Sequence, residues 1–482
     1  MTDGWQFRKT FADYKLREGL RRFGRKLNVG DGWSGGADGV SGGISSGESD
    51  SPSNGVTSDG YGDLLNGATS SGCDGSSNGV TSGEFGGLSD SVVTSGRPDG
   101  SSNGLSSGSL NSAPTSGIDR VCNVAFIGGS VTDGAGASDP GRTSWRSLTC
   151  RYLAEKYPHV SFRFTNAAVG GTDSTYGAFR FRQDVPQAGA VDLLLVEYAV
   201  NDARNRDESV RAMEGIVRQA LRANPEVDIV FVYTTHQSGV ERWLKEGEAD
   251  ANIGSHEEVA DYYGLPSVDF SREVAKAIGA GLFDWGAFSE DNVHPRDFGH
   301  ALYAELMQKF LEAAAADWSN SQPSTASDGA AAGTRLRPPL DPQCYEYGRQ
   351  VGIDEAEIAA GWKREREFAP DSAQICNWTP PAEILLGDAP GDSLVLSFEG
   401  TNIGFVMLAG PDTGAVDISI DEGPAFAYDP FDRYCVMFYR PKIWMLSERL
   451  EPGRHTIRIS IADRKHEESL GKRLHLWKFM VN

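Results

Sequence analysis

The sequence lacks a long hydrophobic run. No apolar stretch approaches the roughly 18 uncharged residues that a transmembrane helix requires. The amino-terminal stretch MTDGWQFRKTFADYK also lacks the apolar segment of a signal peptide. We therefore expect a cytoplasmic protein that does not span a membrane.

Positive charge and clustered cysteines are scarce as well. The 45 Lys and Arg are outnumbered by 67 Asp and Glu, for a formal net charge of -22. So acidic a chain would repel a nucleic-acid backbone, which binds proteins largely through Lys and Arg. The six cysteines form no CxxC pair and no Cys/His cluster at zinc spacing. We expect reduced thiols rather than disulfides, and no nucleic-acid partner, metal or cofactor.

The composition separates two folded units from other segments, as the length of 482 residues allows. Residues 30–117 are mostly Gly, Ser, Asp and Asn, and the unit SNG recurs at Ser53, Ser77 and Ser102. A solenoid repeat would need apolar residues at fixed positions, and these are nearly absent here. We therefore expect a flexible insert, because too little apolar surface is available to offset the entropy of ordering the chain.

Residues 1–29 precede the insert and contain a basic segment, KLREGLRRFGRKL. Apolar residues recur at helical spacing in this segment, which predicts a short amphipathic helix. They are Leu16, Leu20, Phe23 and Leu27. Such a stripe can bind a membrane surface. Because the apolar face is narrow, we favour docking of this helix onto the domain that follows.

Residues 118–316 alternate between short apolar runs and segments of helical periodicity. Helices are expected at 144–157 and 207–224, each followed by a proline that cannot continue the helical ladder. The apolar runs predict strands at 124–127, 160–164, 191–200, 227–233 and 266–270. Nearly continuous apolar strands indicate a parallel sheet covered on both faces, so we predict a doubly wound α/β domain.

A polar linker rich in Ala, Ser and Gly, at 317–333, leads to a different pattern in residues 334–482. Turn sequences such as GPDTG and EPGR now separate short apolar runs, which predict strands without helices between them. The runs are SLVLSF, NIGFVML, AVDISID, YCVMFY, HTIRISI and LHLWKFMV. This pattern is typical of an antiparallel β-sandwich or jelly roll.

Two serines lie in similar strings, Ser130 in AFIGGSVTDG and Ser393 in GDSLVLSFEG. A serine nucleophile requires a base, a carboxylate that orients the base, and donors for the oxyanion. Ser130 follows the first strand of the expected parallel sheet, at the edge where such sheets bind ligands. Ser393 begins an expected sandwich strand. Asp463 and His466 form a DxxH downstream of Ser393. No alternating strands and helices are expected between Ser393 and His466, so nothing would bring these residues together. We therefore favour Ser130.

Three further blocks follow in the α/β region: NAAVGGTDS, VNDA and DNVHP. Together with GGSVT, and in this order, they resemble the SGNH hydrolases, also called the GDSL esterase family, over residues 124–307. This resemblance implies an α/β esterase that uses no cofactor. It also implies that Ser130 is the nucleophile, that His294 is its base and that Asp291 orients His294.

The resemblance further implies an oxyanion hole. Its donors would be the backbone N–H groups of Ser130 and Gly171 and the side-chain amide of Asn201. The chain departs from the family pattern at two positions, where Gly129 replaces the usual aspartate before the serine and Ala199 replaces a glycine. Neither change removes an atom of the expected site.

Each of these residues also has a structural explanation when it is taken singly. Gly171 can be a turn glycine, Asn201 a strand-end cap and His294 a surface residue before a helix. Because the four blocks occur in order, we favour catalysis. His300 is expected to pack within a helix. His236 ranks second to His294 as a base, because no carboxylate is near it in the sequence.

An SGNH domain joined to a jelly roll resembles carbohydrate esterases, whose sandwich modules help to hold glycans. Sugars stack on exposed aromatic rings, and the stretch 424–450, expected to be irregular, contains several aromatic residues that are candidates unless they belong to the core. They are Tyr428, Phe431, Tyr434 and Trp444. We predict a metal-independent serine esterase that removes small acyl groups, above all acetyl, from a carbohydrate. The alternatives are a thioesterase or lysophospholipase-like hydrolase and a catalytically silent glycan-binding protein.

Overall fold

The computed structural model describes most of the chain outside the Gly/Ser-rich region. The described residues are 14–15, 20, 23–24, 27, 120–185, 191–202, 205–320, 336–366, 368, 374–375, 381–447 and 449–482. The insert expected at 30–117 lies outside these ranges, as does the expected linker after residue 320.

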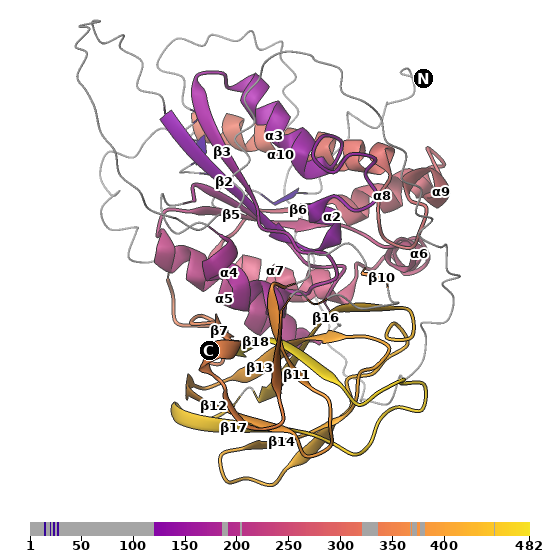
Figure 1. The fold of residues 1–482 in the computed structure, drawn as a ribbon. Coiled ribbons are helices and arrows are strands. Elements are labelled where there is room, and N and C mark those ends of the chain that lie inside the picture. The colour runs from indigo at the N-terminus through magenta and orange to yellow at the C-terminus, as the bar shows by residue number, and fades with distance from the viewer. Residues whose placement is uncertain are drawn as a thin grey trace, which may run out of the picture. The chain divides into compact units, whose positions relative to one another are not determined.

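A six-stranded sheet forms the framework of the first domain (Figure 1). Five strands are parallel in the order β3-β2-β4-β5-β6, and β1 pairs antiparallel with β6 at the edge. Their bounds are β1 Tyr14–Lys15, β2 Arg120–Gly128, β3 Val160–Asn166, β4 Leu193–Glu197, β5 Asp228–Tyr233 and β6 Ser267–Asp269. The five predicted strands are present, and the predicted α/β class is confirmed.

Helices cover both faces of this sheet, because successive strand residues point to opposite sides. Leu194 and Val196 of β4 pack with α4, α5 and α7, whereas Leu193 and Leu195 pack with α3, α8 and α10. The longer helices are α3 Trp145–Lys156, α4 Ser174–Asp184, α5 Arg206–Ala223, α6 Gln237–Glu246, α7 Ala251–Tyr263, α8 Phe270–Gly279 and α10 Asp297–Asn320. Helix α10 therefore extends into the segment where we expected the linker to begin. Within the described ranges, no helix combines the length and the apolar character needed to cross a membrane.

The amino-terminal segment contacts this domain at the few positions described. Leu20, Phe23 and Leu27 are buried in the cluster that also contains side chains of β2 and α10. The Phe23 N–H donates to Asp228 Oδ2 at 2.6 Å. Leu16 lies outside the described residues, so docking of residues 1–29 as one helix stays a prediction.

The described residues on either side of the insert lie at one edge of the sheet. The Leu27 carbonyl is 3.3 Å from His159 Nε2, immediately before β3. Arg120, the first residue of β2, pairs with Val160, the first residue of β3. These residues therefore lie at the amino-terminal ends of the parallel strands, whereas Ser130 follows the carboxyl-terminal end of β2. The flanks of the insert and Ser130 are thus at opposite ends of the strands.

Residues 349–481 form two sheets that pack as a sandwich, with one core cluster drawn from both. The first sheet has the order β10-β16-β13-β18-β11-β9, with β7 also paired to β18, and the second has the order β15-β14-β17-β12-β8. The bounds are β7 Arg349–Gly352, β8 Glu357–Ala360, β9 Lys363–Arg366, β10 Gln374–Ile375, β11 Glu383–Gly387, β12 Ser393–Gly400, β13 Ile403–Ala409, β14 Val416–Ile420, β15 Phe426–Tyr428, β16 Phe438–Ser447, β17 Gly453–Ile461 and β18 Leu474–Val481. Most of the described pairings are antiparallel, which confirms the predicted sandwich.

The predicted strand YCVMFY is largely wrong. Residues 433–437 form a turn, and β16 begins only at Phe438. Asp432 accounts for the turn, because its carboxylate accepts the Tyr434 N–H at 3.1 Å and pairs with Lys442 at 2.8 Å. Local capping by this aspartate therefore overrides the strand preference of the apolar letters.

The stretch 424–450 is also more regular than expected, since it contains β15 and most of β16. Pro441 lies within β16 opposite Leu408 of β13. Proline is tolerated here because the described residues of β10, the neighbour on the other side of β16, pair with Phe438 and Tyr439 and not with Pro441.

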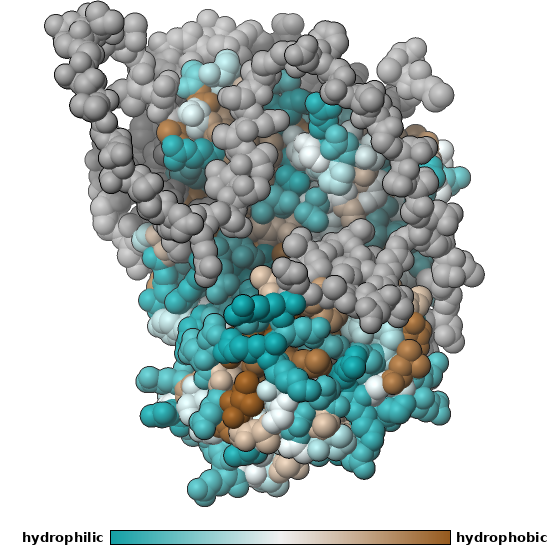
Figure 2. Space-filling model, viewed as in Figure 1, coloured by the Kyte–Doolittle hydropathy of each residue, from teal (hydrophilic) through white to brown (hydrophobic). Residues whose placement is uncertain are grey.

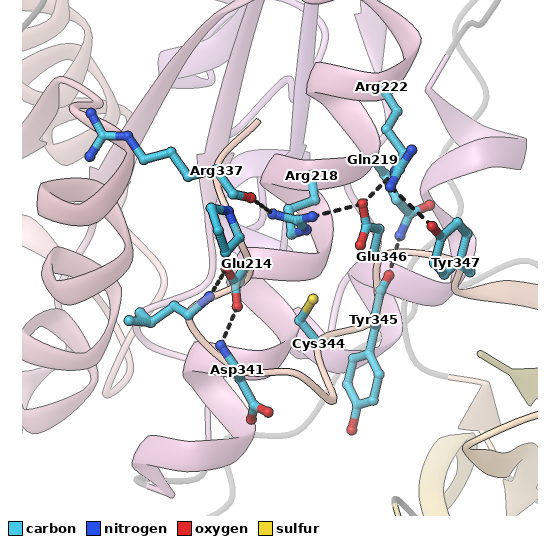
Figure 3. Close-up of polar contacts among 12 residues, drawn as sticks. Glu214, Arg218, Gln219, Arg222, Arg337, Asp341, Cys344, Tyr345, Glu346 and Tyr347 are labelled. Atoms are coloured by element: carbon cyan, nitrogen blue, oxygen red, sulfur yellow. Dashed lines mark hydrogen bonds and ion pairs between the residues drawn. The ribbon is translucent and has the colours of Figure 1, made fainter. Parts of the chain in front are cut away.

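A strap of residues 337–347 connects the two domains, which belong to one structural unit. On α5, Glu214 accepts two backbone N–H groups of the strap, and Arg218 pairs with Glu346 at 3.0 Å (Figure 3). At its other end the strap donates a backbone N–H to Asn482 Oδ1 at 2.9 Å, next to β18. The start of the sandwich is thus fixed to helix α5 by buried, charged contacts.

Candidate active site

Ser130 lies immediately beyond the carboxyl end of β2. Gly129 is the N-cap residue of the short helix α2, Ser130–Asp133, which begins with the serine. The Val169 N–H donates to Gly128 O at 3.0 Å and so holds the loop after β3 beside this turn. The serine that the sequence favoured therefore occupies the expected edge of the parallel sheet.

Ser130, His294 and Asp291 form a continuous chain of hydrogen bonds. Ser130 Oγ is 2.9 Å from His294 Nε2, and His294 Nδ1 is 2.7 Å from Asp291 Oδ2. The second carboxylate oxygen, Oδ1, accepts the backbone N–H groups of Val293 and His294, both at 2.7 Å. The spacing DxxH therefore folds into a turn that Asp291 caps, which places its carboxylate beside the imidazole.

These bonds keep Asp291 ionised. Burial raises the pKa of Asp291, but hydrogen bonds from the His294 side chain and from the N–H groups of His294 and Val293 lower it by more, so the net pKa is well below the usual range. An ionised Asp291 accepts the Nδ1 proton of His294, which leaves Nε2 as the acceptor that faces Ser130 Oγ. In this tautomer His294 can take the proton of the serine hydroxyl.

The expected oxyanion donors lie around the same turn. Gly171 has a φ of 72°, in the left-handed region that favours glycine. A Cβ placed on its neighbour Gly170 would be 3.5 Å from Ser130 Cβ. A Cβ placed on Gly129 would be only 2.2 Å from Asn201 Oδ1. The glycine that stands where the family has aspartate therefore leaves room for the Asn201 amide.

His300 and His236, the two other histidines considered from the sequence, make structural contacts. His300 accepts the Trp145 N–H at 3.2 Å and contacts the Ala135 carbonyl at 3.1 Å, and burial lowers its pKa to about 4. His236 caps α6, and its Nε2 lies 3.4 Å from Asp250 Oδ2. The carboxylate that the sequence did not show near His236 is therefore supplied by the start of α7. No group of three or more His, Cys, Asp and Glu within the described ranges is arranged to hold a metal ion.

The residues of the literal GDSL region are engaged elsewhere. Ser393 begins β12, is only 9% exposed, and accepts a long hydrogen bond of 3.5 Å from Arg458. Asp463 pairs with Lys472, and the His466 ring stacks on Phe431. The DxxH of the sandwich therefore does not form the hydrogen-bonded chain that Ser130 has.

The sequence reasoning missed buried polar residues beneath the Ser130 turn. Glu197, at the end of β4, accepts the hydroxyl hydrogens of Thr132 and Thr234 at 2.9 and 2.7 Å. Burial raises the pKa of Glu197 against the effect of these bonds. On the other side of the turn, the buried Arg180 donates to Gly128 O at 3.3 Å. Glu197 could have been noticed in the sequence, because it lies within the apolar run VDLLLVEYAV. A carboxylate buried in such a strand requires hydrogen-bond partners.

The aromatic candidates of the sandwich differ in exposure. Phe431 is 8% exposed and belongs to the core of the sandwich, so it is not a candidate for stacking on a sugar. Tyr428 and Trp444 are partly buried and stack on each other. Tyr434 is 39% exposed, with Arg433 and Arg440 over its ring. On the face shown in Figure 2, hydrophobic residues of the sandwich are dispersed among hydrophilic ones. Tyr434 is therefore the most accessible of these rings.

Comparison with known proteins agrees with the motifs. Residues 126–302 match the model of the GDSL-like lipase/acylhydrolase family, so the α/β domain is similar to that family, and the match indicates a carboxylic ester hydrolase. Two solved structures of a two-domain esterase active on acetylated mannans, one co-crystallised with mannopentaose, are each 22% identical to this chain. The matches cover 75% of this chain and 90% and 91% of those chains, with TM-scores of 0.59 and 0.60. At this identity the likeness supports the two-domain fold. No curated protein sequence matches significantly.

Proposed function

We propose that the protein is a serine esterase that hydrolyses small acyl esters, above all acetyl esters, of a carbohydrate. The observation that carries this proposal is the hydrogen-bonded chain from Ser130 Oγ through His294 to Asp291. Ser130 acts as the nucleophile, His294 as the general base and then acid, and Asp291 as the carboxylate that orients His294.

The reaction proceeds through an acyl-enzyme. Ser130 Oγ bonds to the acyl carbonyl carbon while its proton passes to His294 Nε2. The N–H groups of Ser130 and Gly171 and the Asn201 amide bind the resulting oxyanion. When the carbon–oxygen bond to the sugar breaks, His294 returns the proton to the leaving alkoxide. A water molecule then repeats these steps on the acyl-enzyme and releases the carboxylic acid.

One observation supports a carbohydrate ester as the substrate. The structures with the same two-domain fold are those of an esterase active on acetylated mannans.

Labelling with a fluorophosphonate probe, followed by peptide mapping, tests the nucleophile directly. We expect an adduct on Ser130 that disappears in His294→Ala and persists in the matched control His466→Ala. An adduct on Ser393 would contradict the proposal. The acyl specificity follows from the rates on p-nitrophenyl acetate and on longer p-nitrophenyl esters, and faster cleavage of long chains would replace the acetyl assignment.

A further inference from the structure

We propose that Asp202, Ser174 and His256 form a buried positioning unit that holds the Gly171 and Asn201 loops together. This inference rests on the proposed function, because it assigns the unit to the oxyanion hole. None of these three residues would touch the substrate. They are positioning residues that act through Gly171 and Asn201.

Asp202 connects the two loops by a pair of hydrogen bonds. Its Oδ1 accepts the Ser174 backbone N–H at 2.9 Å, and its Oδ2 accepts the Ser174 hydroxyl at 2.8 Å. Asp202 directly follows Asn201, and Ser174 begins α4 three residues after Gly171. A bidentate contact of this kind restrains both the separation and the relative orientation of the loops.

Helix α7 supplies the third side of the unit. His256 Nε2 is 2.8 Å from Asp202 Oδ2, and the two side chains are only 1% and 3% exposed. One turn earlier, Asn252 donates its amide to Ala199 O at 2.9 Å and to Asp202 O at 2.8 Å. The helix therefore binds the backbone on both sides of Asn201.

Asn201 depends on this support because its own side chain has few restraints. Its Oδ1 is buried and has no hydrogen-bond partner among the described residues. Its backbone N–H donates to Tyr198 O at 2.9 Å within a tight turn. The amide is therefore positioned by the backbone of the turn, which Asp202 and Asn252 hold, and by its close approach to Gly129. A displacement on the order of 1 Å in such a group costs about 100-fold in rate.

The charge of Asp202 is appropriate to this role. Burial raises the pKa of Asp202, but the hydrogen bond and charge of His256 and the two bonds from Ser174 lower it by more. The carboxylate is therefore an acceptor for all three donors. Asp202→Asn would replace one acceptor oxygen by an NH₂ group, so at least one of these bonds would be lost with almost no change in volume.

The test is a double-mutant cycle between Asp202→Asn and Asn201→Ala, with kcat and KM measured on p-nitrophenyl acetate. Alone, Asn201→Ala should lower kcat about 100 to 1000-fold. Asp202→Asn should lower kcat about 10 to 100-fold with KM within about twofold, because the donors act on the transition state. In the double variant Asp202→Asn should lower kcat by less than it does alone, since the part of its effect that acts through the Asn201 amide is already lost and only the part through Gly171 remains.

A small alkyl boronic acid, which forms a tetrahedral adduct with serine, provides a second readout. We expect its inhibition constant to rise in Asp202→Asn in parallel with the loss of kcat, a change that a purely structural role would not produce. Tyr263→Phe is the matched control. Tyr263 lies on α7, as His256 does, and the substitution removes its buried hydrogen bonds with Glu214 and Arg218 of α5. It should lower Tm and leave kcat and boronate affinity unchanged.

The outcomes separate this inference from the proposed function. If Asn201→Ala lowers kcat but Asp202→Asn does not, or if the two effects multiply, the positioning unit is wrong and the esterase assignment stands. If Asn201→Ala has no effect, the oxyanion hole itself is wrong. Should Asp202→Asn fail to fold, Ser174→Ala removes one hydroxyl bond to the same carboxylate and is expected to lower kcat about 3 to 10-fold. An unchanged kcat there would overturn the inference.

Discussion

The two GDSL-like strings lie in regions that give their serines opposite environments. Ser130 follows β2 in a turn, where parallel strands bring loops from distant parts of the sequence to one edge. Ser393 lies within a ladder, because β12 is paired with β17 on one side and β8 on the other. A short motif therefore indicates catalysis only where the topology supplies the other groups.

Replacing each serine is the strongest way to break this comparison. Ser130→Ala should lower kcat on p-nitrophenyl acetate by about 10,000-fold or more, because it removes the nucleophile. Ser393→Ala should leave kcat unchanged, since among the described residues its hydroxyl makes only one long bond, to Arg458. Loss of activity in the Ser393 variant, with its fold intact by circular dichroism, would reverse the assignment.

Placing the family's usual aspartate before Ser130 sharpens the same comparison. Gly129→Asp converts GGSV into GDSV, yet a Cβ there would lie 2.2 Å from Asn201 Oδ1. We expect displacement of the amide and a fall in kcat of about 10 to 1000-fold. Gly453→Asp, where no described residue lies within 4 Å of the added Cβ, is the control and should be neutral. A fully active GDSV variant would show that Asn201 is not held against Gly129.

The carboxylates of the two regions should also respond differently to pH. Burial, and then the charge of Asp202, raises the pKa of Asp173 from 3.8 to about 6. Ionisation of Asp173 therefore costs folding free energy, so the stability contributed below pH 3.8 is lost as the pH rises through about 6.

Asp173→Asn should remove this penalty and retain a good cap for α4. We expect the variant to be more stable than the original chain by about 1 to 3 kcal/mol at pH 8, and the gain to shrink towards pH 4. Urea unfolding across this range measures it. Asp463→Asn is the control, because the hydrogen bond from Lys472 lowers the pKa of Asp463, so this variant should show no gain in stability as the pH rises. A constant difference between pH 4 and pH 8 would contradict the raised pKa.

The smallest effect is expected from deleting the insert. The described residues that flank residues 30–117 lie at the edge of the sheet opposite Ser130. Replacing these residues with a short Gly/Ser linker should therefore leave kcat/KM on p-nitrophenyl acetate within about twofold. A large loss of activity in a folded deletion variant would show that the insert contributes to the site.

Local patterns predicted much of this fold. The strands β2 to β6, and helices such as α3 and α5, were visible because their apolar periods reflect burial on one or both faces. Ser130, Asp291 and His294, which the structure brings to hydrogen-bonding distance, were predicted because a family resemblance could be read block by block at strand ends. The same approach failed at YCVMFY, where the Asp432 carboxylate caps a turn.

Long-range polar contacts could not be predicted in this way. The strap on α5 pairs Arg218 with Glu346, and no sequence pattern relates these two positions. The same is true of Asp202 and His256, which are 54 residues apart. Such pairs depend on how helices pack, and local patterns in one sequence do not contain that information.

By itself, the sequence determined which helices and strands form, because periodicity and capping are local properties of the chain. It also determined the order of the four motif blocks GGSVT, NAAVGGTDS, VNDA and DNVHP. Only the tertiary structure decided that the imperfect GGSV, rather than the literal GDSL, has a histidine and a carboxylate at hydrogen-bonding distance. The physical reason is that a hydrogen-bonded chain between residues 164 positions apart exists only once the parallel sheet has brought their loops to one edge.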